Sequence, residues 1–109
     1  MNDKDNFVVA TGEGSIGMFE DSGNGIYNGH HFHLADIRGR KALNASKSMI
    51  DFVWDNFPAV KTMRGYSPLD RRDARWAARQ LGFTSLGALP TLSPPCELFV
   101  LFRPIFKDK

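Results

Sequence analysis

The segment Arg38-Gly39-Arg40-Lys41-Ala42 has the residue types best suited to hold a phosphate group. It falls between a predicted strand and a predicted helix, and the first turn of a helix presents about four unpaired backbone N–H groups and a partial positive charge. Gly39 would let the backbone approach a ligand closely, and the three basic side chains would add to the attraction for an anion. The same residues also fit a solvated basic turn in which glycine serves only the backbone geometry.

Two histidines are candidates for proton transfer. His31 and His33 alternate with apolar residues, so both are expected on one face of a strand. An ordinary imidazole titrates near pH ~6.5, which suits a base that takes a proton from an amine. Tyr66 or the neighbouring Ser67, at the end of a later strand, could return a proton to a leaving thiolate. The alternative is a polar strand face with a structural role. No further ligands for a metal site are evident, so none is predicted.

A third group of candidates is the arginine ridge of the second predicted helix. Arg71, Arg75 and Arg79 are spaced by four and share one side of that helix. Such a ridge could grip a nucleotide phosphate or a nucleic acid backbone, although a solvated face is the commoner meaning. Asp70 and Asp73 interrupt the charge. With 14 Lys and Arg against 12 Asp and Glu, the net charge is only +2, and nucleic acid is not an expected partner.

Hydrophobic periodicity and turn signals predict the elements that must position these residues. Ser67-Pro68 is typical of a helix start, with a capping serine followed by proline in the first turn, and Gly82 is typical of a helix end. The other side of that helix, with Trp76 and Leu81, is expected to pack on a sheet. Strands are predicted at 7–10, 15–19, 26–34, 59–66, 83–89 and 97–103, and helices at 42–57 and 68–81.

Length and composition predict one compact domain over residues 1–109, since 42% of the chain is hydrophobic and no linker interrupts it. The single Cys96 cannot form an internal disulfide, which favours a reducing compartment. The polar N-terminus lacks the apolar core of a secretory signal, and no apolar run approaches the ~20 residues that a membrane span needs. A cytoplasmic protein without a membrane partner is therefore expected.

The order of these elements, together with the basic glycine turn and Gln80-Leu81-Gly82-Phe83, resembles the GCN5-related N-acetyltransferase (GNAT) superfamily over residues 6–104. The resemblance implies an α+β fold. Its mixed, mainly antiparallel sheet of about six strands would carry two main helices and lack the family's N-terminal strand and helices. The third strand would splay from the fourth.

The resemblance also implies a function, the transfer of an acyl group from acetyl-CoA to an amine. Acetyl-CoA would lie in the cleft beside the third strand, with its pantetheine arm along Leu34 and Ala35. Its pyrophosphate would bind the amides of Arg38, Gly39, Arg40, Lys41 and Ala42. The chain departs from the family's usual pattern at Asp36 and Lys41 in the turn, and at Ala78, where many members have a tyrosine as general acid.

A second interpretation keeps the fold without the catalysis. Short relatives with few motifs occur among phage-encoded proteins, so the chain could be an adaptor or a structural protein of a phage particle or another assembly. In that case a homo-oligomer or an assembly partner would cover the acceptor side, and the protein would reside in the virion. Binding of acetyl-CoA distinguishes the two interpretations.

Overall fold

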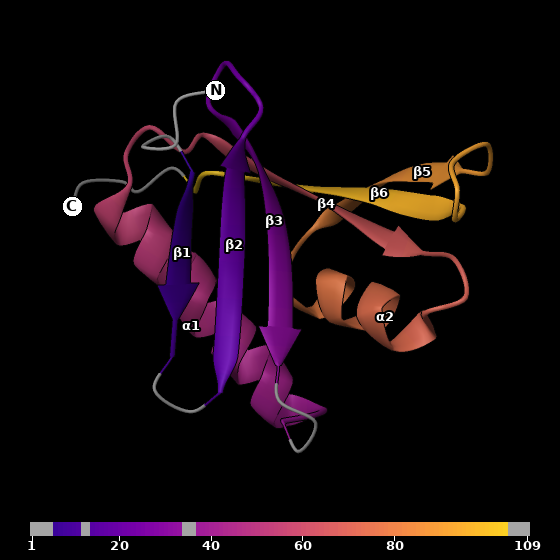
Figure 1. Ribbon diagram of the computed structural model, residues 1–109, viewed down its shortest axis with the longest axis horizontal. Coiled ribbons are helices and arrows are strands. Elements are labelled where there is room, and N and C mark those ends of the chain that lie inside the picture. Colours follow the sequence, from indigo (N-terminus) through magenta and orange to yellow (C-terminus); the bar gives the residue numbers. More distant parts are fainter. Residues whose placement is uncertain (1–5, 12–13, 34–36, 105–109) are drawn as a thin grey trace.

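The computed structural model describes residues 6–11, 14–33 and 37–104. These residues form one six-stranded sheet and two helices (Figure 1), as the predicted α+β architecture requires. The spatial order of the strands is β1-β2-β3-β4-β6-β5, and all neighbours are antiparallel except β3 and β4, which are parallel. The elements are β1 (Phe7–Ala10), β2 (Ser15–Asp21), β3 (Ile26–His33), α1 (Arg40–Asn56), β4 (Thr62–Pro68), α2 (Arg72–Gln80), β5 (Thr84–Leu89) and β6 (Cys96–Phe102).

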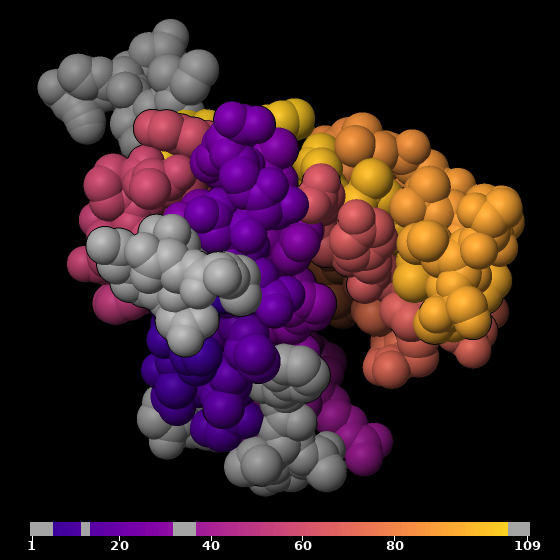
Figure 2. Space-filling view, turned by 45° about the horizontal axis from the view of Figure 1, so that its top comes forward, coloured from indigo at the N-terminus to yellow at the C-terminus, as the bar shows by residue number. Residues whose placement is uncertain are grey.

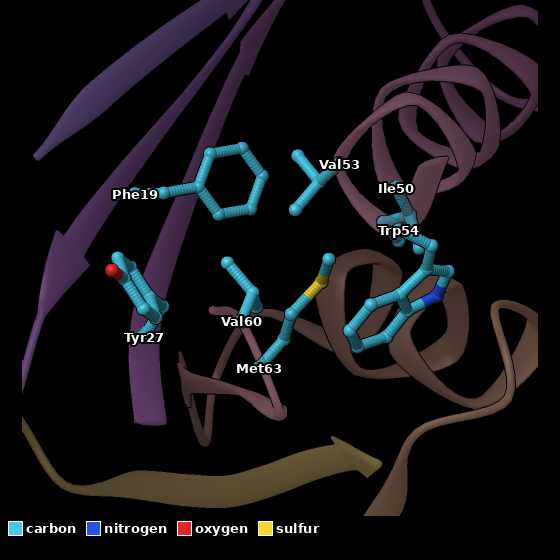
Figure 3. Packing of buried hydrophobic residues seen from close by; sticks show 7 residues of the cluster. All are labelled: Phe19, Tyr27, Ile50, Val53, Trp54, Val60 and Met63. Atoms are coloured by element: carbon cyan, nitrogen blue, oxygen red, sulfur yellow. The ribbon is translucent and has the colours of Figure 1, made fainter. Parts of the chain in front are cut away.

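The main hydrophobic core lies between α1 and the sheet. Figure 1 shows α1 crossing behind β1, β2 and β3, and Figure 3 shows the side chains that fill the space. Apolar residues of α1 recur with the helical period, so one side of the helix is buried. The cluster consists of Phe19, Tyr27, Ile50, Val53, Trp54, Val60 and Met63. Neither described helix is long and apolar enough to cross a membrane.

Both helices cover the same face of the sheet. Phe99 and Leu101 alternate with outward residues on β6 and therefore share a face. Leu101 packs against the core under α1, while Phe99 lies under Arg79 of α2. The opposite face has no described helix over it and exposes apolar side chains, among them Ile16 on β2, Tyr66 on β4 and Phe102 on β6.

The start of α2 differs from the prediction. Ser67 and Pro68 are the last residues of β4, paired with Glu97 and Cys96 of β6, and α2 begins only at Arg72. The Leu69 N–H continues this pairing by donating to the Pro95 carbonyl. The predicted capping serine is therefore a strand residue, because a long-range ladder outweighs a local capping signal.

The sheet-facing side of α2 also differs from the prediction. Arg75 and Arg79 point at the sheet and bind the carboxylate of Glu97, at 2.7 and 2.6 Å. Trp76, which was expected to pack on the sheet, is 49% exposed. Two residues of the arginine ridge thus make a structural contact with a buried carboxylate on β6, whereas Arg71 pairs with Asp73 at the surface.

The end of α2 confirms the role predicted for Gly82. The Gly82 N–H donates to the Arg79 carbonyl and the Phe83 N–H donates to the Ala78 carbonyl. These two bonds form a Schellman motif, which needs a left-handed residue, and Gly82 has a φ of 94°. The chain is thereby turned directly into β5.

Candidate functional site

The sheet opens between β3 and β4, as predicted. These two parallel strands pair only at Ile26–Asn28 with Thr62–Arg64. Beyond that point β3 stays paired with β2 as far as His33, and β4 stays paired with β6 as far as Pro68. Figure 2 shows the two halves of the molecule adjoining at the top and separated by a gap toward the bottom of the view. We call this opening the V.

Backbone groups line the V. Thr62 N–H donates to the Gly25 carbonyl, so odd residues of β3 and even residues of β4 direct their main-chain groups toward each other. The Asn28–Arg64 pair is the last of the ladder, so the Gly29 carbonyl has no ladder partner in β4, and the main chain of Tyr66 faces the V from the other side. An extended chain that contains amides could therefore hydrogen-bond along the V as a strand does.

The N-terminus of α1 follows the open end of β3. Gly39 is the N-cap residue with φ 56° and ψ −126°, no side chain caps the helix, and no acidic residue lies in its first turn. A Cβ added to Gly39 would meet nothing within 4 Å. Arg38, Arg40 and Lys41 are exposed around this turn. The helix begins two residues earlier than predicted, which brings Lys41 and Ala42 into the first turn.

His31 lies on the helix-covered face of the sheet. Its Nδ1 is hydrogen-bonded to Ser46 Oγ of α1 at 2.9 Å, and its ring meets the edge of Phe19. Ser46 itself is buried. His31 thus ties β3 to α1, and its proposed role as a base remains a prediction.

Tyr66 lies on the opposite, helix-free face, because it alternates with the buried Met63 along β4. The structure therefore does not bring Tyr66 and His31 together. Tyr66 is 45% exposed beside the V. Leu34, Ala35 and Asp36, and the side chain of His33, lie outside the described part of the structure.

His30 is a candidate that the sequence analysis missed. Asn28 pairs with Arg64, and His30 and Tyr66 each follow two residues later on their strands. His30 therefore lies across the V from Tyr66, and both side chains are on the helix-free face. His30 Nε2 lies 3.1 Å from Glu20 Oε1 of β2. The sequence feature that could have revealed His30 is the register of the β2–β3 hairpin, which places Glu20 diagonally opposite His30 on the same face of the sheet.

Two grooves lie away from the V. One, of about 390 Å³, is between α1 and the end of α2 and is lined by Ile50, Trp54, Leu81 and Leu101 among others. The other, of about 350 Å³, is between β1 and α1. The described residues include no group of three or more His, Cys, Asp or Glu side chains placed to hold a metal ion.

Solved N-acetyltransferases have the same fold. The microcin C7 self-immunity acetyltransferase, in complex with acetyl-CoA and AMP, has a TM-score of 0.73 and 17% identity, covering 92% of this chain and 62% of that one. A variant of the spermidine N-acetyltransferase from Vibrio cholerae has a TM-score of 0.73 and 10% identity, covering 90% and 64%. The ribosomal-protein-S5-alanine acetyltransferase from Vibrio fischeri has a TM-score of 0.71 and 10% identity, covering 87% and 57%. This chain has the GNAT fold.

The GNAT-fold chain spans about three fifths of the length of these three enzymes. Its sequence matches no protein-family model and no curated protein. The V and the uncapped N-terminus of α1 are features of this chain's own structure.

Proposed function

We propose that this protein binds acetyl-CoA in the V and transfers the acetyl group to an amine. The observation that carries the proposal is the splayed parallel pair β3 and β4, followed by the uncapped, cation-flanked N-terminus of α1. An uncapped first turn offers N–H donors to a pyrophosphate, and Arg38, Arg40 and Lys41 add charge at the same place. The solved microcin C7 self-immunity acetyltransferase, which contains acetyl-CoA and AMP, supports the choice of ligand.

The residues present fit the cosubstrate. The space in front of Gly39 is open, so a phosphate could approach the first turn of α1. The Gly29 carbonyl on β3 and the main chain of Tyr66 on β4 lie beyond the last ladder pair and suit the amides of a pantetheine arm. When bound, acetyl-CoA would supply an activated thioester.

His30 and Tyr66 are the side chains we assign to proton transfer in this reaction. The acceptor amine attacks the thioester carbonyl, the C–N bond forms and the C–S bond breaks. The imidazole of His30 would take the amine proton, with Glu20 holding the ring, and the Tyr66 hydroxyl would protonate the leaving thiolate. This assignment replaces His31 by its neighbour, because His30 shares a face with Tyr66 and His31 does not.

Calorimetric titration with coenzyme A tests the cofactor site. Gly39→Ala should weaken coenzyme A binding at least about tenfold, since a side chain would enter the open approach to the α1 amides. Affinity of the wild-type protein should fall as ionic strength rises, because exposed charges are screened.

Gly23→Ala is the matched control for this titration. Gly23 lies in the β2–β3 turn with φ 93°, and a Cβ there also meets nothing within 4 Å. Both glycines have a positive φ, so both substitutions strain the backbone, but only Gly39 is at the site. Absence of coenzyme A binding to the wild-type protein at low salt, or equal loss in both variants, would contradict the proposal.

A second candidate function is that of a non-catalytic GNAT-fold adaptor. It is favoured by the helix-free face of the sheet, on which Ile16, Met18 and Phe102 are exposed together with Tyr66. Exposed apolar surface of this kind suits a protein partner. An adaptor would show this face protected in a complex while coenzyme A fails to bind, which separates it from the enzyme.

A further inference from the structure

The outer edge of β1 presents unpaired main-chain groups. β1 is the last strand at one side of the sheet, and no described strand pairs with its outer edge. The Thr11 N–H donates to the Ser15 carbonyl, which sets the phase of the β1–β2 ladder. Odd residues of β1 therefore bond to β2, and the N–H and C=O groups of Val8 and Ala10 point outward.

Nothing in the sequence of β1 protects this edge. Natural edge strands avoid pairing by means of charged side chains, proline or bulges. β1 is Phe-Val-Val-Ala, its pairing with β2 has no register shift, and Val8 is 61% exposed. The groove of about 350 Å³ beside it is lined by Val9, Met49 and Phe52 among others, so an added strand would also meet apolar surface on the helix side.

The hydrogen-bonding pattern of this edge is complementary to itself. In an antiparallel arrangement about a two-fold axis at Val9, Val8 of each copy lies opposite Ala10 of the other, and these pairs exchange N–H···O bonds in both directions. The same register sets Val9 opposite the partner's Val9 on the helix side. β1 also carries no charge that would favour an acidic or basic partner over a second copy.

We propose that two copies of this chain associate edge to edge through β1, forming one continuous twelve-stranded sheet from two six-stranded ones. The contact is independent of coenzyme A binding, because the V lies on the other side of β2 and β3. The contact uses no charged side chain of β1.

A charge-swap experiment tests the interface. In the double variant Val8→Lys with Ala10→Lys, a lysine of one copy faces a lysine of the other at both Val8–Ala10 pairs of the interface. The double variant Val8→Asp with Ala10→Asp places two aspartates opposite each other at the same two pairs. Each variant alone should be monomeric in analytical ultracentrifugation, with a dissociation constant raised at least about tenfold over wild type. An equimolar mixture should form heterodimers that native mass spectrometry separates by mass.

Ile16→Lys with Met18→Lys is the matched control. These residues are exposed on the same face but lie on β2, one strand in from the edge, so this variant should still dimerise. A monomeric wild-type protein at its highest soluble concentration would overturn the proposal. The proposal would also be overturned if the lysine and aspartate double variants both still dimerised, or if their equimolar mixture stayed monomeric.

Amide hydrogen exchange of the wild-type protein gives a test that needs no substitution. The Val9 amide, which bonds to β2, should exchange slowly at every concentration. The outward amides of Val8 and Ala10 should exchange fast in dilute solution and become protected as the concentration rises. Fast exchange of these two amides at all concentrations would exclude the interface.

Discussion

Glu97 determines how α2 lies on the sheet. Its carboxylate accepts hydrogen bonds from Ser85 Oγ at 2.5 Å, Arg75 Nε at 2.7 Å and Arg79 Nη2 at 2.6 Å. With three donors bound in this way, the group is suited to hold an element in place rather than to take a proton from a substrate. Sequence reasoning assigned these arginines to solvent because their acidic partner lies on another element.

We expect Glu97→Gln to lower the free energy of unfolding by about 1–3 kcal/mol, because a neutral amide offers one acceptor to three donors. Urea unfolding measures the change. Asp73→Asn is the control, since the Asp73–Arg71 pair is exposed and screened by solvent and should contribute far less. An equal effect of both substitutions would contradict this assignment.

The contribution of Glu97 should depend on pH. The Ser85 hydroxyl, followed by Arg75, holds the pKa of Glu97 below its ordinary value of 4.5. The unfolded chain then binds more protons than the folded one in this range, so the stabilisation is complete above pH 4.5 and is lost as pH falls through the folded-state pKa. The stability difference between wild type and Glu97→Gln should therefore shrink as the solution is acidified, which unfolding curves across that range will measure.

His30 is expected to affect turnover rather than cosubstrate binding. If its imidazole takes the proton of the acceptor amine, His30→Gln should lower kcat by about 10²-fold or more and leave the affinity for coenzyme A unchanged. A thiol-release assay and calorimetry measure the two quantities. His31→Gln is the neighbouring control and should act mainly on stability, because its ring bonds to the buried Ser46.

At the scale of elements, Arg103 connects the end of β6 to the end of α1. Its guanidinium donates to the carbonyls of Trp54, Phe57 and Val60 at 2.7–2.8 Å and lies over the Trp54 ring. No basic residue lies in the last turn of α1 itself. A residue 47 positions beyond α1 thus supplies the cation that a helix C-terminus favours.

We expect Arg103→Ala to lower the free energy of unfolding by about 2–3 kcal/mol and to speed amide exchange in the last turn of α1. Arg103→Lys keeps the charge but cannot span three carbonyls with one ammonium group, so its loss should be intermediate. Urea unfolding and hydrogen exchange measure both effects. A lysine variant as stable as wild type would show that charge alone, and not the fork of donors, stabilises the helix end.

At the scale of the whole molecule, few pairs join the two halves of the sheet. Three residue pairs form the β3–β4 ladder, whereas seven form the β2–β3 ladder and seven the β4–β6 ladder. The V therefore exists because both of its strands find better partners on their outer sides. A ligand that contacts both edges would add a third connection between the halves, beside the ladder and the core.

We expect coenzyme A and inorganic pyrophosphate to raise Tm equally at matched saturation but to differ in amide protection, because only the longer ligand reaches along β3 toward β4. Saturation at about 100 times Kd corresponds to about 2.7 kcal/mol of stabilisation for a single site. Exchange of the Tyr66 amide, which faces the V from β4, should slow with coenzyme A and not with pyrophosphate. Equal protection by both ligands would place the cosubstrate outside the V.

The splay between β3 and β4 was expected from the resemblance to the GNAT superfamily, whereas by itself the sequence determined the order and type of the elements and the role of Gly82. These features depend on hydrophobic period, turn residues and chain order, which act over short stretches of chain. Only the tertiary structure decided that Ser67 belongs to a strand, that Arg75 and Arg79 face the sheet, and that His30 rather than His31 shares a face with Tyr66. Each of these outcomes depends on a partner distant in sequence, and local patterns carry no information about such partners until the strands are in register.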